Sequence, residues 1–357
     1  MTHAVPSRRP TRRTLLVAGG AVGLGALAAA CGSGGDAASG ATGTGSRTGA
    51  GSGSGSATPA AGPWSFTDDR KKTASLKSAP TRVVAYTGTA AALYDFGAGD
   101  RITGVFGPTR VKDGKPDVQA GDLDIDRVTV LGNAWGEFNL EKYAALRPEL
   151  LVTDMWEPDS LWYVPDGSKD KILALAPSVA LDVAKISLPE VIGRHAELAE
   201  ALGADLKAER VTAAKARFEA AAESLRKAAK QRGGVKVMAA SASPELLYLS
   251  DPRVYPDLSY FRSLGVEFVI PQKVTGSFFE NLSWEKADSY PADLILLDNR
   301  TGTLQPKDLA SKPAWSQLPA VKAGQVTPWL SEPRFSYAGC APLVETLAKA
   351  LGEARKV

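Results

Sequence analysis

The spacing of apolar residues predicts one helix that is much longer than the others. Residues 205–232 contain neither Gly nor Pro, and glycines lie near both ends. Apolar side chains recur there at steps of three and four, which places them on one helical face. At about 1.5 Å per residue the helix would span roughly 40 Å. We expect it to join two lobes, the alternative being a long surface helix of one domain. The apolar stripe comprises Val211, Ala214, Phe218, Ala222, Leu225 and Ala229.

On both sides of this helix, short apolar runs alternate with helical patterns. Such alternation is typical of an α/β fold with a mostly parallel sheet. It predicts an N-terminal lobe over 64–204, a linking helix over 205–232 and a C-terminal lobe over 233–357. Before the linking helix we expect a hairpin at 64–77, strands at 82–86, 101–106, 128–131, 149–153 and 178–181, and helices at 90–96, 140–146, 170–176 and 188–202. After it we expect strands at 235–239, 245–249, 267–270, 294–297 and 325–327, and helices at 255–264, 284–289, 315–318 and 338–351.

One local pattern occurs in both predicted lobes. Glu141 precedes a proline, an apolar strand and then Asp154, and Glu285 precedes the same succession, which ends at Asp298. The spacing from Glu to Asp is 13 residues in both lobes. The repetition favours two similar lobes related by a pseudo-twofold axis.

The N-terminus has the pattern of an export signal. Four arginines precede the uncharged segment 15–30, which is too short for a comfortable membrane span. We therefore interpret residues 1–30 as a signal peptide. An Arg-Arg pair before Leu15 and Leu16 resembles a twin-arginine signal, and the export route stays open.

Small residues before Cys31 and a glycine after it resemble a bacterial lipobox, which predicts a lipid on Cys31. The alternative is a plain signal peptide beside an unrelated cysteine.

The next segment predicts a tether. Of the 32 residues in 32–63, 30 are Gly, Ser, Ala, Thr or Pro, so the segment cannot bury a core. Residues 31–63 thus read as a lipidated cysteine followed by a flexible linker. This arrangement predicts a protein held at the outer face of the cell membrane through Cys31. A cell-envelope component or a surface enzyme would share these features.

Composition and motifs exclude several classes of protein. The chain carries a formal charge of +3, but without its first 30 residues it has 38 basic and 39 acidic residues, which argues against a nucleic-acid surface. Two histidines and two cysteines are too few for a His- or Cys-based zinc site, so we expect no resident metal or cofactor. His195 lies in a predicted helix, at a position that we expect to be on the surface. The chain has no dinucleotide fingerprint, P-loop or nucleophile elbow, and we predict that it is not an enzyme.

Candidate ligand-binding residues follow the predicted strands, because ligands of open α/β sheets bind beyond the carboxyl ends of the strands. Aromatic residues and arginines dominate this set, and they suit an organic, partly charged ligand. For each member the alternative is a packing residue or a solvated charge. The candidates are Tyr86, Arg110, Trp135, Trp156, Trp162, Tyr163, Ser241, Phe278, Arg300, Trp329 and Arg334.

The whole pattern resembles the bacterial ABC-transporter substrate-binding proteins for ferric siderophores, haem and vitamin B12. The resemblance extends from Trp64 to the C-terminus. It implies two Rossmann-like lobes joined by one long helix, with the ligand in a cleft between them. The segments that carry it are Pro80–Val84, Asn139–Glu141, Arg147–Val152, Trp284–Glu285 and Tyr290–Leu296.

The resemblance also implies partners and roles for particular residues. Glu141 and Glu285 match the glutamates with which each lobe meets the membrane permease, and Trp135, six residues before Glu141, matches a tryptophan that faces the ligand. We expect a monomer that captures a ferric siderophore, with iron present only inside the chelate. A hydroxamate fits better than a catecholate, whose greater negative charge would need more arginines. An exported two-lobed enzyme and a non-transport cell-envelope lipoprotein are the alternatives.

Overall fold

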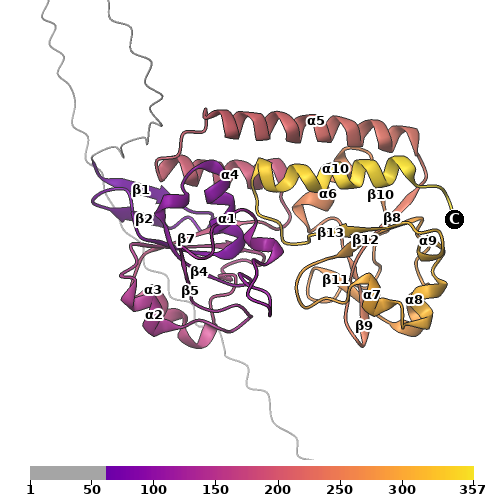
Figure 1. Ribbon diagram of the computed structural model, residues 1–357, viewed down its shortest axis with the longest axis horizontal. Coiled ribbons are helices and arrows are strands. Elements are labelled where there is room, and N and C mark those ends of the chain that lie inside the picture. Colours follow the sequence, from indigo (N-terminus) through magenta and orange to yellow (C-terminus); the bar gives the residue numbers. More distant parts are fainter. Residues whose placement is uncertain (1–61) are drawn as a thin grey trace, which may run out of the picture. The chain divides into compact units, whose positions relative to one another are not determined.

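Residues 62–357 are described by a computed structural model (Figure 1). The predicted signal peptide, Cys31 and the tether up to residue 61 lie outside this range. The first lobe holds the following elements in chain order: β1 (Trp64–Thr67), β2 (Thr73–Leu76), β3 (Val83–Tyr86), α1 (Thr87–Phe96), β4 (Ile102–Phe106), β5 (Thr129–Val130), α2 (Leu140–Ala145), β6 (Leu150–Met155), α3 (Lys169–Leu173), β7 (Ser178–Asp182) and α4 (Leu188–Ala201).

The sheet of the first lobe is parallel throughout. Its strand order is β5-β4-β3-β6-β7, so the chain starts at β3, moves out on one side and then crosses to the other. The four residues of β3 and the six of β6 are all buried, as expected for strands covered on both faces. The order of the strands reverses between β3 and β6, and the carboxyl ends of these two strands mark the usual ligand position in such a sheet.

The second lobe repeats this arrangement with an antiparallel extension. The sheet order is β11-β9-β8-β12-β13, and β10 also pairs with β8. Strands β8, β12, β13 and β10 pair in parallel, whereas β9 and β11 are antiparallel. The elements are β8 (Lys236–Ala242), β9 (Leu246–Ser250), α6 (Pro256–Ser263), β10 (Glu267–Phe268), β11 (Phe279–Ser283), β12 (Leu294–Asp298), α7 (Pro306–Leu309), α8 (Pro313–Gln317), α9 (Pro319–Lys322) and β13 (Val326–Trp329).

Two long helices connect the lobes. Helix α5 (Glu209–Gln231) leads from the first lobe to the second, and α10 (Tyr337–Glu353) lies beside it (Figure 1). Buried residues of α5 such as Phe218 and Leu225 belong to one apolar core that also includes residues of α10 and of both lobes. The linking helix is therefore half of a two-helix layer. No helix in residues 62–357 has both the length and the apolar character that crossing a bilayer requires.

The structure corrects several predicted elements. The long helix begins at Glu209 rather than at residue 205, because the Asp205 carboxylate accepts a hydrogen bond from Lys207 N and forms a turn. Helix α1 starts at Thr87, directly after β3, rather than at residue 90. The predicted helix 284–289 is only a 3₁₀ turn over Trp284–Lys286. Strand β11 was missed because it forms only through its antiparallel pairing with β9.

Candidate functional site

Contacts join the carboxyl ends of the two sheets. Trp156, which follows β6, packs against Tyr255 and Phe278 of the second lobe, with ring centroids 5.7 Å and 6.3 Å away. The Thr301 hydroxyl, just beyond β12, donates a hydrogen bond to the Asp117 carboxylate of the first lobe. The predicted candidates Trp156 and Phe278 thus lie where the lobes meet.

A buried carboxylate stands at the centre of this interface. Glu332, in the connection between β13 and α10, is 7% exposed. Its Oε2 lies 3.0 Å from the Tyr86 hydroxyl and 3.1 Å from Trp162 Nε1, both in the first lobe. Gln119 Nε2 lies 3.2 Å from the same oxygen and 2.8 Å from the Tyr86 hydroxyl. Arg300 of the second lobe pairs with Glu332 Oε1. Burial raises the pKa of Tyr86 well above its ordinary value, so this hydroxyl stays protonated and donates.

An aromatic surface lies next to this carboxylate. Trp135 is 61% exposed, and its ring meets the rings of Trp162 and Tyr163 at centroid distances of 4.8 Å and 5.1 Å. Tyr163 in turn stacks on Tyr86 at 5.4 Å. Tyr163 has φ of 59°, a left-handed conformation that disfavours a bulky side chain and often marks a functional position. The fold brings four predicted candidates together in this surface.

The arginines among the candidates are already paired with carboxylates. Arg300 pairs with Asp298 at 2.9 Å as well as with Glu332. Burial opposes the charge of Arg300, but the Asp298 carboxylate beside it raises the pKa of the guanidinium. Arg334 reaches the first lobe, where it lies 2.9 Å from both Asp95 and Asp122. Each of these arginines sits between two carboxylates.

Arg334 also explains a glycine. Gly121 has φ of 55°, and a Cβ there would overlap the Arg334 guanidinium. The pairing of Arg334 across the lobes therefore requires glycine at this position.

Two candidates occupy places other than those expected. The Trp329 ring is 2% exposed and donates from Nε1 to Asp257 Oδ2 at 2.6 Å, so it packs in the core and presents no surface to a ligand. The Arg110 guanidinium folds back on its own loop, pairing with Asp126 at 2.6 Å and donating to two backbone carbonyls there.

The repeated Glu-to-Asp pattern has a structural counterpart in both lobes. The Thr89 hydroxyl, at the start of α1, donates to Asp154 at 2.8 Å, and the Ser241 hydroxyl of β8 donates to Asp298 at 2.7 Å. Each aspartate stands at the end of a central strand, and both are buried. In the first lobe the aspartate also meets His195, which is fully buried rather than on the surface as the helical pattern suggested.

Sequence reasoning missed three residues of this region. Gln119 lies between the predicted strands 101–106 and 128–131, where no element was predicted, and it belongs to a short 3₁₀ turn. Glu332 lies between two predicted candidates, Trp329 and Arg334. Its place in that loop is the one feature of the sequence that could have indicated a role in the site. Asp257 follows Pro256 at the start of α6 and is fully buried, and burial raises its pKa to about 7. No local pattern distinguishes this aspartate from a helix-start residue in water.

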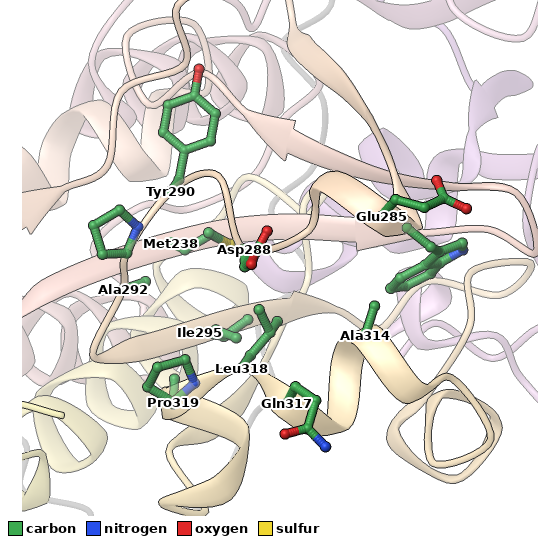
Figure 2. Close-up of a pocket in the computed structure, with 13 residues that line it drawn as sticks. Met238, Glu285, Asp288, Tyr290, Ala292, Ile295, Ala314, Gln317, Leu318 and Pro319 are labelled. Atoms are coloured by element: carbon green, nitrogen blue, oxygen red, sulfur yellow. The ribbon is translucent and has the colours of Figure 1, made fainter.

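The predicted permease contacts lie away from the interface. Glu141 is exposed in α2, and Glu285 is exposed in the 3₁₀ turn after β11. Figure 2 shows Glu285 and Asp288 beside a pocket of about 480 Å³ whose wall is mainly apolar. A hydrogen bond from its own backbone N–H, and then the Ser283 hydroxyl, lower the pKa of Glu285. Both glutamates are thus exposed and open to a partner.

Comparison with known proteins decides the family. The profile of the periplasmic binding protein family matches residues 83–333. The chain belongs to this family. Proteins of this kind bind substrates and are not enzymes, in agreement with the sequence-based prediction. A search of curated proteins gave no match.

Several solved structures that resemble this periplasmic binding protein are those of siderophore-binding or iron-uptake proteins. DesE, a ferric-siderophore receptor protein from Streptomyces coelicolor, is 54% identical, with a TM-score of 0.80, and the match covers 82% of this chain and 99% of DesE. The petrobactin-binding protein YclQ from Bacillus subtilis is 15% identical, with a TM-score of 0.59 over 82% of this chain and 98% of YclQ. PiuA, an iron uptake ABC transporter substrate-binding protein from Streptococcus pneumoniae, is 18% identical, with a TM-score of 0.58 over 83% and 98%. The two distant structures share the fold of two lobes and a long helix.

Proposed function

We propose that this periplasmic binding protein captures a ferric siderophore and delivers it to an ABC permease. The observation that carries the proposal is the 54% identity with the ferric-siderophore receptor DesE along 99% of that chain. The position of the candidates supports it, because the aromatic surface and the buried donors gather at the carboxyl ends of the strands of the first lobe, where that lobe meets the second. Trp135, Trp162 and Tyr163 offer an organic chelate a surface, while Tyr86 and Gln119 offer hydrogen bonds.

The charge balance of the interface favours a hydroxamate chelate. Arg300 and Arg334 each lie between two carboxylates, so neither guanidinium leaves a surplus positive charge. A tris-catecholate iron complex is strongly anionic and would be repelled by the remaining carboxylates. A tris-hydroxamate complex is neutral or cationic, and it needs only apolar surface and a few hydrogen bonds. The siderophore supplies all the iron ligands, and we propose that the protein adds no cofactor.

The same proposal includes the anchor and the partner. Lipidation of Cys31, which lies outside the described residues, would hold the protein at the outer face of the membrane as a monomer. Glu141 and Glu285 would then meet basic side chains of the permease. Export followed by lipidation is tested by the mass of the mature N-terminus, with Cys31→Ala as the unmodified control.

Titration of intrinsic tryptophan fluorescence tests the ligand. Ferric hydroxamates, ferric catecholates, haem and cobalamin are each added to the purified protein. We expect quenching with sub-micromolar affinity for a ferric hydroxamate, because Trp135 and Trp162 lie in the proposed site. If neither the ferric hydroxamates nor the ferric catecholates quench the fluorescence, the proposed function is wrong, whatever the response to haem and cobalamin. A preference for the catecholate would retain the siderophore and remove the hydroxamate.

A further inference from the structure

The donors around Glu332 form a defined set. The Tyr86 hydroxyl, Gln119 Nε2 and Trp162 Nε1 converge on Glu332 Oε2 at 3.0–3.2 Å. All three are neutral donors from the first lobe, and we call them the donor triad. Tyr86 and Gln119 are almost fully buried, and Trp162 forms part of the aromatic surface around Trp135. The triad is therefore continuous with the surface to which the siderophore is proposed to bind.

The acceptor that binds the donor triad, the Glu332 carboxylate, comes from the second lobe. Glu332 follows β13 of the second lobe, and its separation from Tyr86 is 246 positions along the chain. Its other oxygen pairs with Arg300, which is itself held by Asp298. One carboxylate thus links three donors of the first lobe to a guanidinium of the second. A direct connection of this kind ties the lobes together at the proposed binding site.

A buried donor without an acceptor destabilises the folded protein, because it has lost its hydrogen bonds to water and gained none in return. Glu332 satisfies the triad when no ligand is present. The oxygen atoms of an iron chelate are acceptors of the same kind, so chelate and carboxylate compete for the same three donors. When the chelate takes them, Arg300 keeps Asp298 as its partner, and Glu332 is free to turn toward water.

We propose that Glu332 is an internal competitor of the ligand. In the unliganded protein its carboxylate fills the donor triad and holds the lobes together, and it leaves when a chelate binds. Glu332 also sets specificity, because the displaced carboxylate stays near the ligand and repels anionic chelates more than neutral ones. This inference rests on the proposed function, since it assigns the triad to the siderophore.

The test uses Glu332→Ala and Glu332→Gln in the full mature chain. Affinities for ferrichrome, a neutral ferric hydroxamate, and for ferric enterobactin, an anionic catecholate, are measured by calorimetry. Removing a competitor strengthens binding, so we expect the affinity of Glu332→Ala for ferrichrome to rise by roughly threefold or more. The gain for ferric enterobactin should be larger, because a negative charge is also removed. The control is Glu157→Gln, an exposed carboxylate next to Trp156, whose affinities should equal those of the wild type.

Thermal unfolding gives a second readout. An interaction present only without ligand stabilises only the unliganded protein, so the Glu332 variants should lose about 2–4 °C in melting temperature without ferrichrome and less at saturation. Weaker ferrichrome binding by both variants would overturn the inference and make Glu332 a ligand contact. An equal loss of melting temperature with and without ferrichrome would also overturn it. If the wild type binds neither chelate, the proposed function is wrong. If the wild type binds ferrichrome at least as tightly as the variants do, only the proposal that Glu332 competes with the ligand is wrong.

Discussion

The imidazole of His195 and the carboxylate of Asp154 meet in the core of the first lobe, with Nε2 3.2 Å from Oδ1. The other ring nitrogen, Nδ1, lies 2.9 Å from the carbonyl oxygen of Val191. The Val191 carbonyl oxygen only accepts hydrogen bonds, so Nδ1 donates to it and Nε2 faces the Asp154 carboxyl group. The pair lies next to the interface between the lobes. The His195 ring packs on Phe335, which follows β13 of the second lobe, with ring centroids 5.5 Å apart.

Replacing His195 by Ala should lower the free energy of unfolding by about 1–3 kcal/mol, because it leaves the buried Asp154 side chain without one of its hydrogen-bond partners. Urea denaturation measures the loss. Combining His195→Ala with Asp154→Ala isolates the pair, since the double variant should lose less than the sum of the single variants. Additive losses would mean that the two side chains contribute independently.

Asp257 should make stability depend on pH. Its pKa in the folded protein is about 7 because of burial, well above the ordinary value of 3.8. The folded state then holds a proton that the unfolded state has released, so stability is greatest below about pH 4 for this group and falls as pH rises to about 7. At about 1.4 kcal/mol per pH unit the fall approaches 4 kcal/mol.

Asp257→Asn tests this dependence because the amide oxygen still accepts the Trp329 hydrogen bond and cannot ionise. Chemical denaturation between pH 4 and pH 8 should give a flatter stability profile for the variant than for the wild type. Equal slopes for the two proteins would show that other groups control the pH dependence.

Trp135 should contribute to ligand affinity without contributing to stability. Its ring is 61% exposed, so Trp135→Ala should change the free energy of unfolding by less than about 0.5 kcal/mol. An aromatic side chain at a binding surface typically contributes about 2 kcal/mol, which corresponds to a roughly 30-fold weaker affinity for the ferric hydroxamate. Calorimetry measures the affinity and thermal unfolding measures the stability. An unchanged affinity would exclude Trp135 from the site.

The two exposed glutamates should act in delivery and not in capture. Glu141→Ala with Glu285→Ala should reduce iron-siderophore uptake by whole cells to the level of cells lacking the protein, while the purified variant keeps its ligand affinity. Glu219→Ala on the exposed side of α5 is the matched control and should leave uptake intact. Normal uptake by the double variant would remove both residues from the permease contact.

Much of the fold was predictable because its strands and helices have strong local patterns. The buried runs of β3, β6 and β12 and the periodic stripe of α5 were all located within a few residues. Elements that depend on pairing were not. Strand β11 exists through its antiparallel partner β9, and the predicted helix after it shortens to a 3₁₀ turn.

The candidate site followed the same division. Trp135, Trp162 and Tyr163 could be selected because they are aromatic residues after predicted strands. Trp329 fitted this rule equally well, yet its N–H is bonded to a buried aspartate in the core. Local sequence does not distinguish a tryptophan that faces a ligand from one that faces Asp257.

By itself, the sequence determined the α/β pattern, the long connecting helix and a set of aromatic residues and arginines after the strands. The tertiary structure alone decided which of them meet and which charges are neutralised. Hydrophobic periodicity is local, so it can be read along the chain, whereas the partners of Glu332 and His195 come from distant segments that only folding brings within hydrogen-bond distance.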